Sequence, residues 1–298
     1  MYFEDMMLAQ KDYNELKFGT NISEEKKKEL SKDLALNSYN SINKMIEKVR
    51  AKNGSHEDEL LYSSVDILRY IMSMLNLWDI NPESVADAFS LKDIYLDMNF
   101  KLNQRTWDGQ PVAIVDIDDV LAEFRIPFAL FLNKKFNLSV NTESEQYFFV
   151  EDIKASPENL NPEKVFESFV NERRFRRIPV VEGAHAFLQS LREKGYWIQL
   201  LTARPKEDLK IFYDTYFWLN SSGLYFDRID FSPEKFRWCA NSEYYESNSI
   251  KFAIDDSPKH AVEYADHGIS VKVPFKSYNK NVKCDNVEFY NNFTDILI

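Results

Sequence analysis

The stretch Val112–Leu121 constrains the fold of this chain more than any other. It reads Val-Ala-Ile-Val-Asp-Ile-Asp-Asp-Val-Leu, so an apolar run meets two carboxylates, Asp116 and Asp118, spaced two residues apart. A short apolar run of this kind predicts a strand buried on both faces, as in a parallel sheet. At the end of such a strand, one carboxylate can act as a nucleophile and the next can transfer a proton.

Two later apolar runs also end in polar residues. Trp197–Thr202 ends in a hydroxyl group and is followed by Arg204 and a proline, and the run from Lys251 ends in Asp255 and Asp256. Helical patterns separate the runs, which predicts an α/β fold with a parallel sheet covered on both faces. Because the carboxyl ends of parallel strands share one edge, we expect the polar residues to meet there. The strands are expected near residues 112–117, 197–202, 225–230, 251–255 and 269–273.

From about residue 108 to the C-terminus, the order of these residues resembles the four signature motifs of the haloacid dehalogenase superfamily of phosphotransferases. The resemblance implies a Rossmann-like sheet with a helical cap. It implies that Asp116 attacks phosphorus to form an aspartyl-phosphate, and that Asp118 protonates the leaving oxygen and later activates water. It also implies that Thr202 donates a hydrogen bond to a phosphoryl oxygen and that Lys235 offsets negative charge. Lys251 is the alternative lysine; the spacing favours Lys235, since it leaves room for a helix from 234 to about 246.

The same resemblance implies a Mg²⁺ cofactor. Its ligands would be the carboxylates of Asp116, Asp255 and Asp256 and the main-chain carbonyl of Asp118. Mg²⁺ prefers oxygen ligands, and a cation is needed because a phosphate monoester is anionic and repels nucleophiles.

Within the superfamily, Val120–Phe124 and Phe175–Ala184 resemble passages of the deoxyribonucleotidases, which hydrolyse nucleoside monophosphates. That resemblance implies that Phe124 lines a base pocket and that Phe148 or Phe149 stacks on the base. The expected function is therefore a Mg²⁺-dependent 5′-nucleotidase with a small-molecule nucleotide substrate.

The chain departs from the nucleotidase pattern at two places. Asp119 stands where those enzymes have glycine, and Arg204 stands where they have a small polar residue. An arginine at this place resembles the phosphatase half of polynucleotide kinases. Arg204 could therefore contact a second phosphate. The basic cluster 173–177, which includes Arg176, is either a solvated helix end or a substrate clamp, because arginine forks match phosphate oxygens. A phosphatase for another substrate, such as nucleic-acid 3′-phosphate ends, stays open, as does a non-catalytic nucleotide-binding protein.

The chain changes character near residue 107, which predicts an all-α domain over 1–106 and a phosphatase domain over 107–298. In the first, helices are expected near 23–50, 57–76 and 91–103, and one helix face carries Leu61, Val65, Leu68, Met72 and Leu75. In the second, the segment 124–177 is too long for a simple loop and has its own helical patterns, 127–136 and 162–173, which predicts a cap that excludes water and selects the substrate.

The helical domain resembles the all-α nucleotide pyrophosphatases that include dimeric dUTPases. Those proteins bind Mg²⁺ through acidic pairs on two facing helices, whereas this chain has Asn37, Asn40, Ser63 and Asp66 at the corresponding places. Neutral side chains would not hold Mg²⁺ against water, so we expect no pyrophosphatase activity. The domain is better described as a dimerisation or regulatory module, with a homo-oligomer as the expected assembly.

Composition narrows the remaining classes. A net charge of −11 argues against broad binding to duplex nucleic acid, because neutralisation of phosphates dominates such binding. The sequence has no apolar run of about 18 residues and starts without a signal-peptide pattern, so a cytoplasmic protein without a membrane span is expected. Cys239 and Cys284 are the only cysteines and are expected to be reduced thiols.

Overall fold

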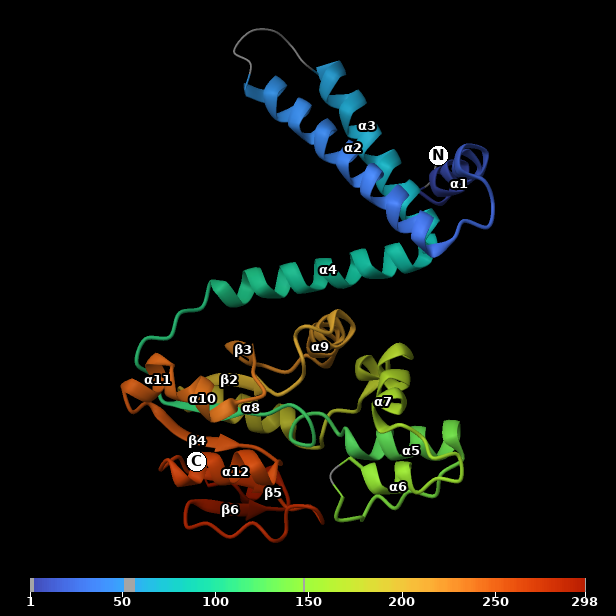
Figure 1. Cartoon of the computed structure of the whole chain (residues 1–298). Helices are drawn as coiled ribbons and strands as arrows, with labels where there is room; N and C mark the ends of the chain where they lie inside the picture. Colours follow the sequence, from blue (N-terminus) through green and yellow to red (C-terminus); the bar gives the residue numbers. More distant parts are fainter. Residues whose placement is uncertain (1–2, 51–56, 147, 298) are drawn as a thin grey trace. The chain divides into compact units, whose positions relative to one another are not determined.

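The computed structural model describes residues 3–50, 57–146 and 148–297, which form two compact units, Met1–Ser90 and Leu91–Ile298 (Figure 1). Each unit is described by itself. Within the described ranges, none of the helices combines the length and apolar character that a membrane crossing requires.

The first unit is entirely helical. Gln10 of the first helix donates to the Ser73 hydroxyl at 2.9 Å, and Asn14 donates to the Ser73 carbonyl at 3.1 Å. Lys48 and Glu59, 2.8 Å apart, join the adjacent ends of the second and third helices, which run antiparallel. The expected all-α character is confirmed, although the first helix was not predicted. The elements are α1 (Phe3–Phe18), α2 (Glu24–Arg50), α3 (Glu57–Leu77) and the start of α4 (Pro82–Asn103).

The division between the units falls inside α4, whereas the boundary inferred from sequence follows residue 106. The second half of α4 packs in the second unit. Leu102 is buried in the core of that unit, and the ring of Tyr95 lies 4.8 Å from the ring of Tyr216.

The second unit is built on a sheet of six parallel strands in the order β3-β2-β1-β4-β5-β6, which confirms the expected α/β class. Val115 pairs with Leu200 on one side and with Ile254 on the other, so the ends of the first, second and fourth strands lie next to one another. The sixth strand was not predicted. The strands are β1 (Val112–Val115), β2 (Trp197–Thr202), β3 (Arg228–Phe231), β4 (Ile250–Ile254), β5 (Val271–Pro274) and β6 (Val287–Tyr290).

Helices cover both faces of this sheet, as expected. Ala113 and Val115 of β1 belong to one buried cluster with α8 (Ala184–Glu193) and α9 (Leu209–Ser222). Val112 and Ile114 belong to a second cluster on the other face, because successive side chains of a strand point to opposite sides. That cluster includes residues of α10 (Lys235–Ala240), α11 (Glu243–Glu246) and α12 (Pro258–Asp266). The single helix expected from 234 to about 246 is thus two short helices.

The segment between β1 and β2 contains the expected helical cap (Figure 1). Its core is a cluster of phenylalanines; Phe128, for example, meets Phe169 edge to face at 5.2 Å. Asn161 caps the helix that begins at Pro162, because its side-chain oxygen accepts hydrogen bonds from the main-chain N–H groups of residues 163 and 164. The elements are α5 (Arg125–Phe136), α6 (Val150–Lys154), α7 (Pro162–Asn171) and the 3₁₀ turn η1 (Arg174–Arg177); a second 3₁₀ turn, η2 (Phe293–Asp295), lies near the C-terminus.

Candidate active site

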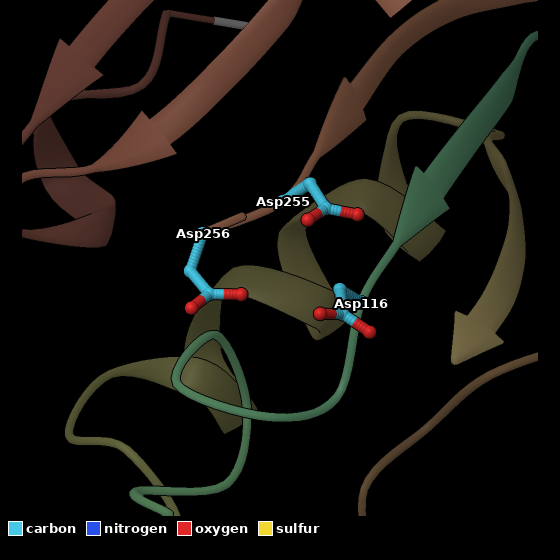
Figure 2. A group of neighbouring side chains, drawn as sticks. All are labelled: Asp116, Asp255 and Asp256. Carbon is cyan, nitrogen blue, oxygen red and sulfur yellow. The ribbon is translucent and has the colours of Figure 1, made fainter. Parts of the chain in front are cut away.

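Four of the expected site residues lie at the carboxyl edge of the sheet. Figure 2 shows the three carboxylates among them. Asp116 follows β1 directly, Thr202 ends β2, and Asp255 and Asp256 follow β4. The Asp116 N–H donates to the Ile254 carbonyl at 2.9 Å, which extends the pairing of β1 and β4 to the site itself. All four side chains are buried. The buried strands therefore end in buried polar groups, which is costly unless those groups are paired or bind a ligand.

The three carboxylates form a compact cluster. One oxygen from each of Asp116, Asp255 and Asp256 lies within 4.8 Å of the others (Figure 2). Burial raises the pKa of Asp116 to about 6, against the opposing effect of Lys235. Burial, together with the charges of Asp119, Asp116 and Asp255, raises the pKa of Asp256 well above its usual value. Three carboxylates this close together are stable as anions only if cations neutralise them.

The contacts of Asp256 fit a metal ligand. The Tyr278 hydroxyl donates to its Oδ2 at 2.6 Å, and Asn279 Nδ2 donates to its main-chain oxygen at 3.0 Å. Its Oδ1 is buried and has no hydrogen-bond partner among the described residues. A buried acceptor in this state needs an explanation, and a hard cation among carboxylate oxygens supplies one. The donor set therefore fits Mg²⁺, with Asp116, Asp255 and Asp256 as carboxylate ligands.

Lys235 supplies a positive charge to the cluster. It begins α10 and is only 1% exposed, and its Nζ lies 2.7 Å from Asp116 Oδ1 and 2.7 Å from Asp255 Oδ2. Burial lowers the pKa of Lys235, but the two carboxylates more than offset it, so the net shift is upward. Lys251 instead lies exposed on β4 and donates to the Asn248 carbonyl. The geometry therefore brings Lys235, and not Lys251, to the carboxylates.

Asp118 is held by an arginine, a contact that the sequence did not reveal. Arg204 donates from Nε to Asp118 Oδ2 at 2.8 Å and from Nη2 to Asp118 Oδ1 at 2.6 Å. Its Nη1 donates to the Thr215 hydroxyl at 3.0 Å, and its guanidinium lies 4.6 Å from the centre of the Phe175 ring. The main-chain N–H of Arg204 also donates to the Thr202 hydroxyl at 3.2 Å. One arginine thus orients both Asp118 and Thr202.

Asp119 has a backbone conformation that explains why glycine suits its position. Its φ is +53°, in the left-handed region that glycine adopts readily and that aspartate tolerates better than most residues. Its side chain is buried and accepts from the Arg125 N–H at 2.9 Å, at the start of the cap. Burial raises the pKa of Asp119 to about 6, even though this hydrogen bond and Lys276 favour the anion.

The aromatic residues expected to bind a base differ in accessibility. Phe124 is buried and stacks on Phe128 and Phe175, at 5.4 Å and 5.8 Å between ring centres. Phe149 is fully buried, with the Arg125 guanidinium 4.4 Å from its ring centre, so that face is not open to a base. Phe148, at 41% exposure, meets Phe124 edge to face and is the open member of the group.

Arg176 lies in a contact between η1 and α9. Its Nε donates to Asp214 Oδ1 at 2.6 Å, and Arg173 donates to the same oxygen at 3.1 Å. Asp214 is completely buried. Two arginines of the basic cluster thus neutralise a buried carboxylate of α9.

Comparison with protein-family models and with curated proteins found no match. Similar solved structures include a predicted phosphoglycolate phosphatase from Haemophilus somnus, with 15% identity, 64% of this chain and 97% of that chain covered, and a TM-score of 0.45. CbbY from Rhodobacter sphaeroides, in complex with phosphate, is 15% identical; the match covers 62% of this chain and 96% of that chain, with a TM-score of 0.41. A subfamily IA hydrolase of the HAD superfamily from Geobacter sulfurreducens is 14% identical; the match covers 63% of this chain and 94% of that chain, with a TM-score of 0.42.

Proposed function

We propose that this chain is a Mg²⁺-dependent phosphomonoester hydrolase of the haloacid dehalogenase type. The observation that carries the proposal is the buried cluster of Asp116, Asp255 and Asp256 with Lys235 at 2.7 Å from two of the carboxylates. A nucleophile, a cation site and a fixed positive charge at one sheet edge are what phosphoryl transfer requires.

The three carboxylates and the Asp118 main-chain carbonyl would hold Mg²⁺, which neutralises charge on the phosphoryl oxygens when bound. Asp116 attacks phosphorus, the bond from phosphorus to the leaving oxygen breaks, and Asp118 gives its proton to that oxygen. Water then attacks the aspartyl-phosphate and gives a proton back to Asp118, which frees Asp116 and releases phosphate. Atoms and charge balance over the two steps without any further reactant.

The surrounding residues fix this geometry. Lys235 holds Asp116 in place through one oxygen, since its Nζ lies 2.7 Å from Oδ1. Thr202 would donate its hydroxyl proton to a phosphoryl oxygen while it accepts from the Arg204 N–H. Arg204 would hold Asp118 in one orientation through its two hydrogen bonds and would stabilise the carboxylate that is left once the proton has gone to the leaving oxygen. Positioning of this kind lowers the activation barrier, because the reacting groups have already lost the freedom of motion that they would otherwise lose on reaching the transition state.

For the substrate we propose a nucleoside monophosphate. Phe148 is partly exposed and lies against Phe124, which supports an aromatic surface that a base could stack on. The fork of Arg204 is already occupied by Asp118. That contact favours a substrate with a single phosphate over one that presents a second phosphate to Arg204, and it ranks nucleic-acid 3′-phosphate ends as the second candidate.

The test is phosphate release from a panel of ribo- and deoxynucleoside monophosphates and a 3′-phosphorylated oligonucleotide, with Mg²⁺ or with EDTA. We expect Mg²⁺-dependent release from one class of monophosphate, which Asp116→Asn abolishes. Asp93→Asn is the matched control, because Asp93 is exposed on α4. Release that survives in Asp116→Asn would remove Asp116 as the nucleophile, and silence on every nucleotide would remove the proposed substrate class.

A further inference from the structure

The helical unit exposes apolar side chains and buries polar ones. On α2, Ser38 and Ser41 are buried against the rest of the unit together with Leu34. The apolar residues Tyr39, Ile42, Ile46 and Val49 are instead 42% to 70% exposed. Their spacings of three, four and three residues place them on one stripe of the helix.

The third helix has a matching stripe. Leu61, Val65 and Leu68 are 59%, 43% and 46% exposed, although their spacing predicts the core side of a helix. Successive residues of a helix are about 100° apart, so each stripe lies roughly a quarter turn around its helix from the side that contacts the other helix. On both helices this offset runs in the same sense when each helix is followed from its N-terminus to its C-terminus. Because the two helices are antiparallel, both stripes fall on the same side of the hairpin. We call these seven side chains the hairpin face.

The unit needs this face to be covered. Among its described residues, only Met7, Leu34, Met72 and Leu77 are apolar and buried, which is a small core for a helical unit of this length. From their exposed fractions, the seven side chains present roughly 700 Å² of surface, close to the roughly 800 Å² that each partner contributes to a stable interface. An apolar patch of that size on a monomer marks an interaction site.

We propose that the hairpin face pairs with the same face of a second copy of this chain. The face carries no charge, so it offers nothing to a charged partner. Two parallel apolar stripes on an antiparallel hairpin are complementary to themselves under a two-fold rotation, and the product is a four-helix bundle. The occupant is therefore a second hairpin, which buries in the dimer what each unit leaves exposed.

The mass of the full chain in solution tests this proposal. We expect light scattering at tens of micromolar to give twice 35.2 kDa, and Ile46→Glu and Leu68→Glu to give the monomer with unchanged helical circular dichroism. Leu16→Glu is the matched control, because Leu16 is 89% exposed on α1 of the same unit and should leave the dimer intact. A monomeric wild-type chain overturns the proposal whether or not the variants fold. A dimer that persists in helical Ile46→Glu and Leu68→Glu overturns the assignment of the surface.

A second inference comes from the contacts around Asp256 and rests on the proposed metal site. The Tyr278 hydroxyl holds Asp256 Oδ2 at 2.6 Å, while Oδ1 has no partner among the described residues. The Tyr278 ring lies 4.7 Å from the Arg125 guanidinium, which donates to the carbonyls of Thr142 at 2.9 Å and Gln146 at 2.6 Å. A chain of contacts thus runs from the carboxylate cluster to the loop of the cap.

We infer that Tyr278 is a positioning residue that turns Asp256 Oδ1 toward the cation. Outer hydrogen bonds of this kind typically change metal affinity by about 10- to 100-fold. Phenylalanine at this position keeps the ring beside Arg125 and removes the hydroxyl that donates to the carboxylate. The expected effect is therefore on cation binding, with little change in the stability of the metal-free chain.

Titration calorimetry with Mg²⁺ alone tests the inference. We expect Tyr278→Phe to weaken Mg²⁺ binding by at least about tenfold. Tyr245→Phe is the matched control, because Tyr245 is a partly exposed tyrosine of α11. If the wild type and Tyr278→Phe bind Mg²⁺ equally, the positioning role is wrong and the proposed function stands. If the wild type binds no Mg²⁺, the proposed function fails together with it.

Discussion

Asp119 joins two features that a single substitution can separate. Its backbone is left-handed, and its carboxyl is buried with a pKa raised from 3.8 to about 6. The folded state therefore binds this proton more tightly than the unfolded state. The stability that Asp119 contributes is complete below pH 4 and is lost as the pH rises through 6.

Asp119→Asn keeps the tolerance for the left-handed backbone and the acceptor for Arg125, but it has no proton to lose. We expect the variant to gain stability relative to the wild type between pH 4 and pH 7, by on the order of 2 kcal/mol. Urea unfolding in EDTA across that pH range measures the difference in stability between the two chains. The contributions of the other buried acids are common to both chains and cancel in this difference. Parallel curves for the two chains would show that Asp119 does not titrate as the buried geometry implies.

Lys235 is the cation on which the metal-free site depends. In Lys235→Met, Asp116 and Asp255 would lose their shared partner, which we expect to cost about 3–5 kcal/mol of unfolding free energy in EDTA. Phosphatase turnover should fall by at least about 100-fold, because the positive charge near the transferring group is gone.

The control for Lys235→Met is Lys251→Met, since Lys251 is exposed on β4. Urea unfolding and phosphate release on both variants distinguish the two lysines. An active and stable Lys235→Met, or a damaged Lys251→Met, would reverse the assignment.

Sequence and structure agree best for residues whose position follows from the strands. Asp116, Thr202, Asp255 and Asp256 could be placed together because each ends or follows a strand of one parallel sheet. The ion pair between Arg204 and Asp118 could not, because it depends on a guanidinium reaching across 86 residues of sequence. The burial of Phe149 likewise depends on how the cap packs, which spacing along the chain does not encode.

At the scale of elements, apolar character decided which strands the sequence could reveal. The run that became β1 is fully apolar, and those that became β2 and β4 are interrupted inside only by Gln199 and Lys251, so all three could be recognised as buried strands. β6 reads Val-Glu-Phe-Tyr and pairs only with β5 at the edge of the sheet, so its pattern is short and partly polar. The break between α10 and α11 falls at Asn241–Ser242, where the Ser242 N–H donates to the Cys239 carbonyl. Such a turn is too local to alter helical periodicity.

The contact between η1 and α9 tests whether the basic cluster binds substrate or supports the fold. Arg176→Met would remove one of two arginines from the buried Asp214, so we expect a loss of about 2–4 kcal/mol of stability and an unchanged KM. Arg174→Met is the control, because Arg174 pairs with Glu172 at the surface, where such pairs contribute less than about 1 kcal/mol. A KM that rises tenfold in a stable Arg176→Met would instead support a substrate clamp.

At the scale of the whole molecule, every residue of the proposed site belongs to Leu91–Ile298. The first unit supplies none of them, and the role proposed for it is to pair with a second copy through the hairpin face. Joining the units through one helix has a consequence for the second unit, because the end of α4 is part of that unit's core. Tyr95 packs on Tyr216 and Phe212, and Leu102 is 7% exposed within the same cluster.

The two possible boundaries therefore predict different behaviour for shortened chains. A chain that starts at Leu91 keeps Tyr95, Leu102 and the contact of Arg105 with Asp227, so we expect it to fold and to retain phosphatase turnover. A chain that starts at residue 107 loses all three, and removing one buried leucine side chain alone costs about 2–5 kcal/mol. Urea unfolding should give the shorter chain a free energy of unfolding that is lower by at least about 3 kcal/mol, with turnover per folded molecule unchanged. Equal stability would mean that α4 only tethers the second unit and that the boundary inferred from the sequence is the functional one.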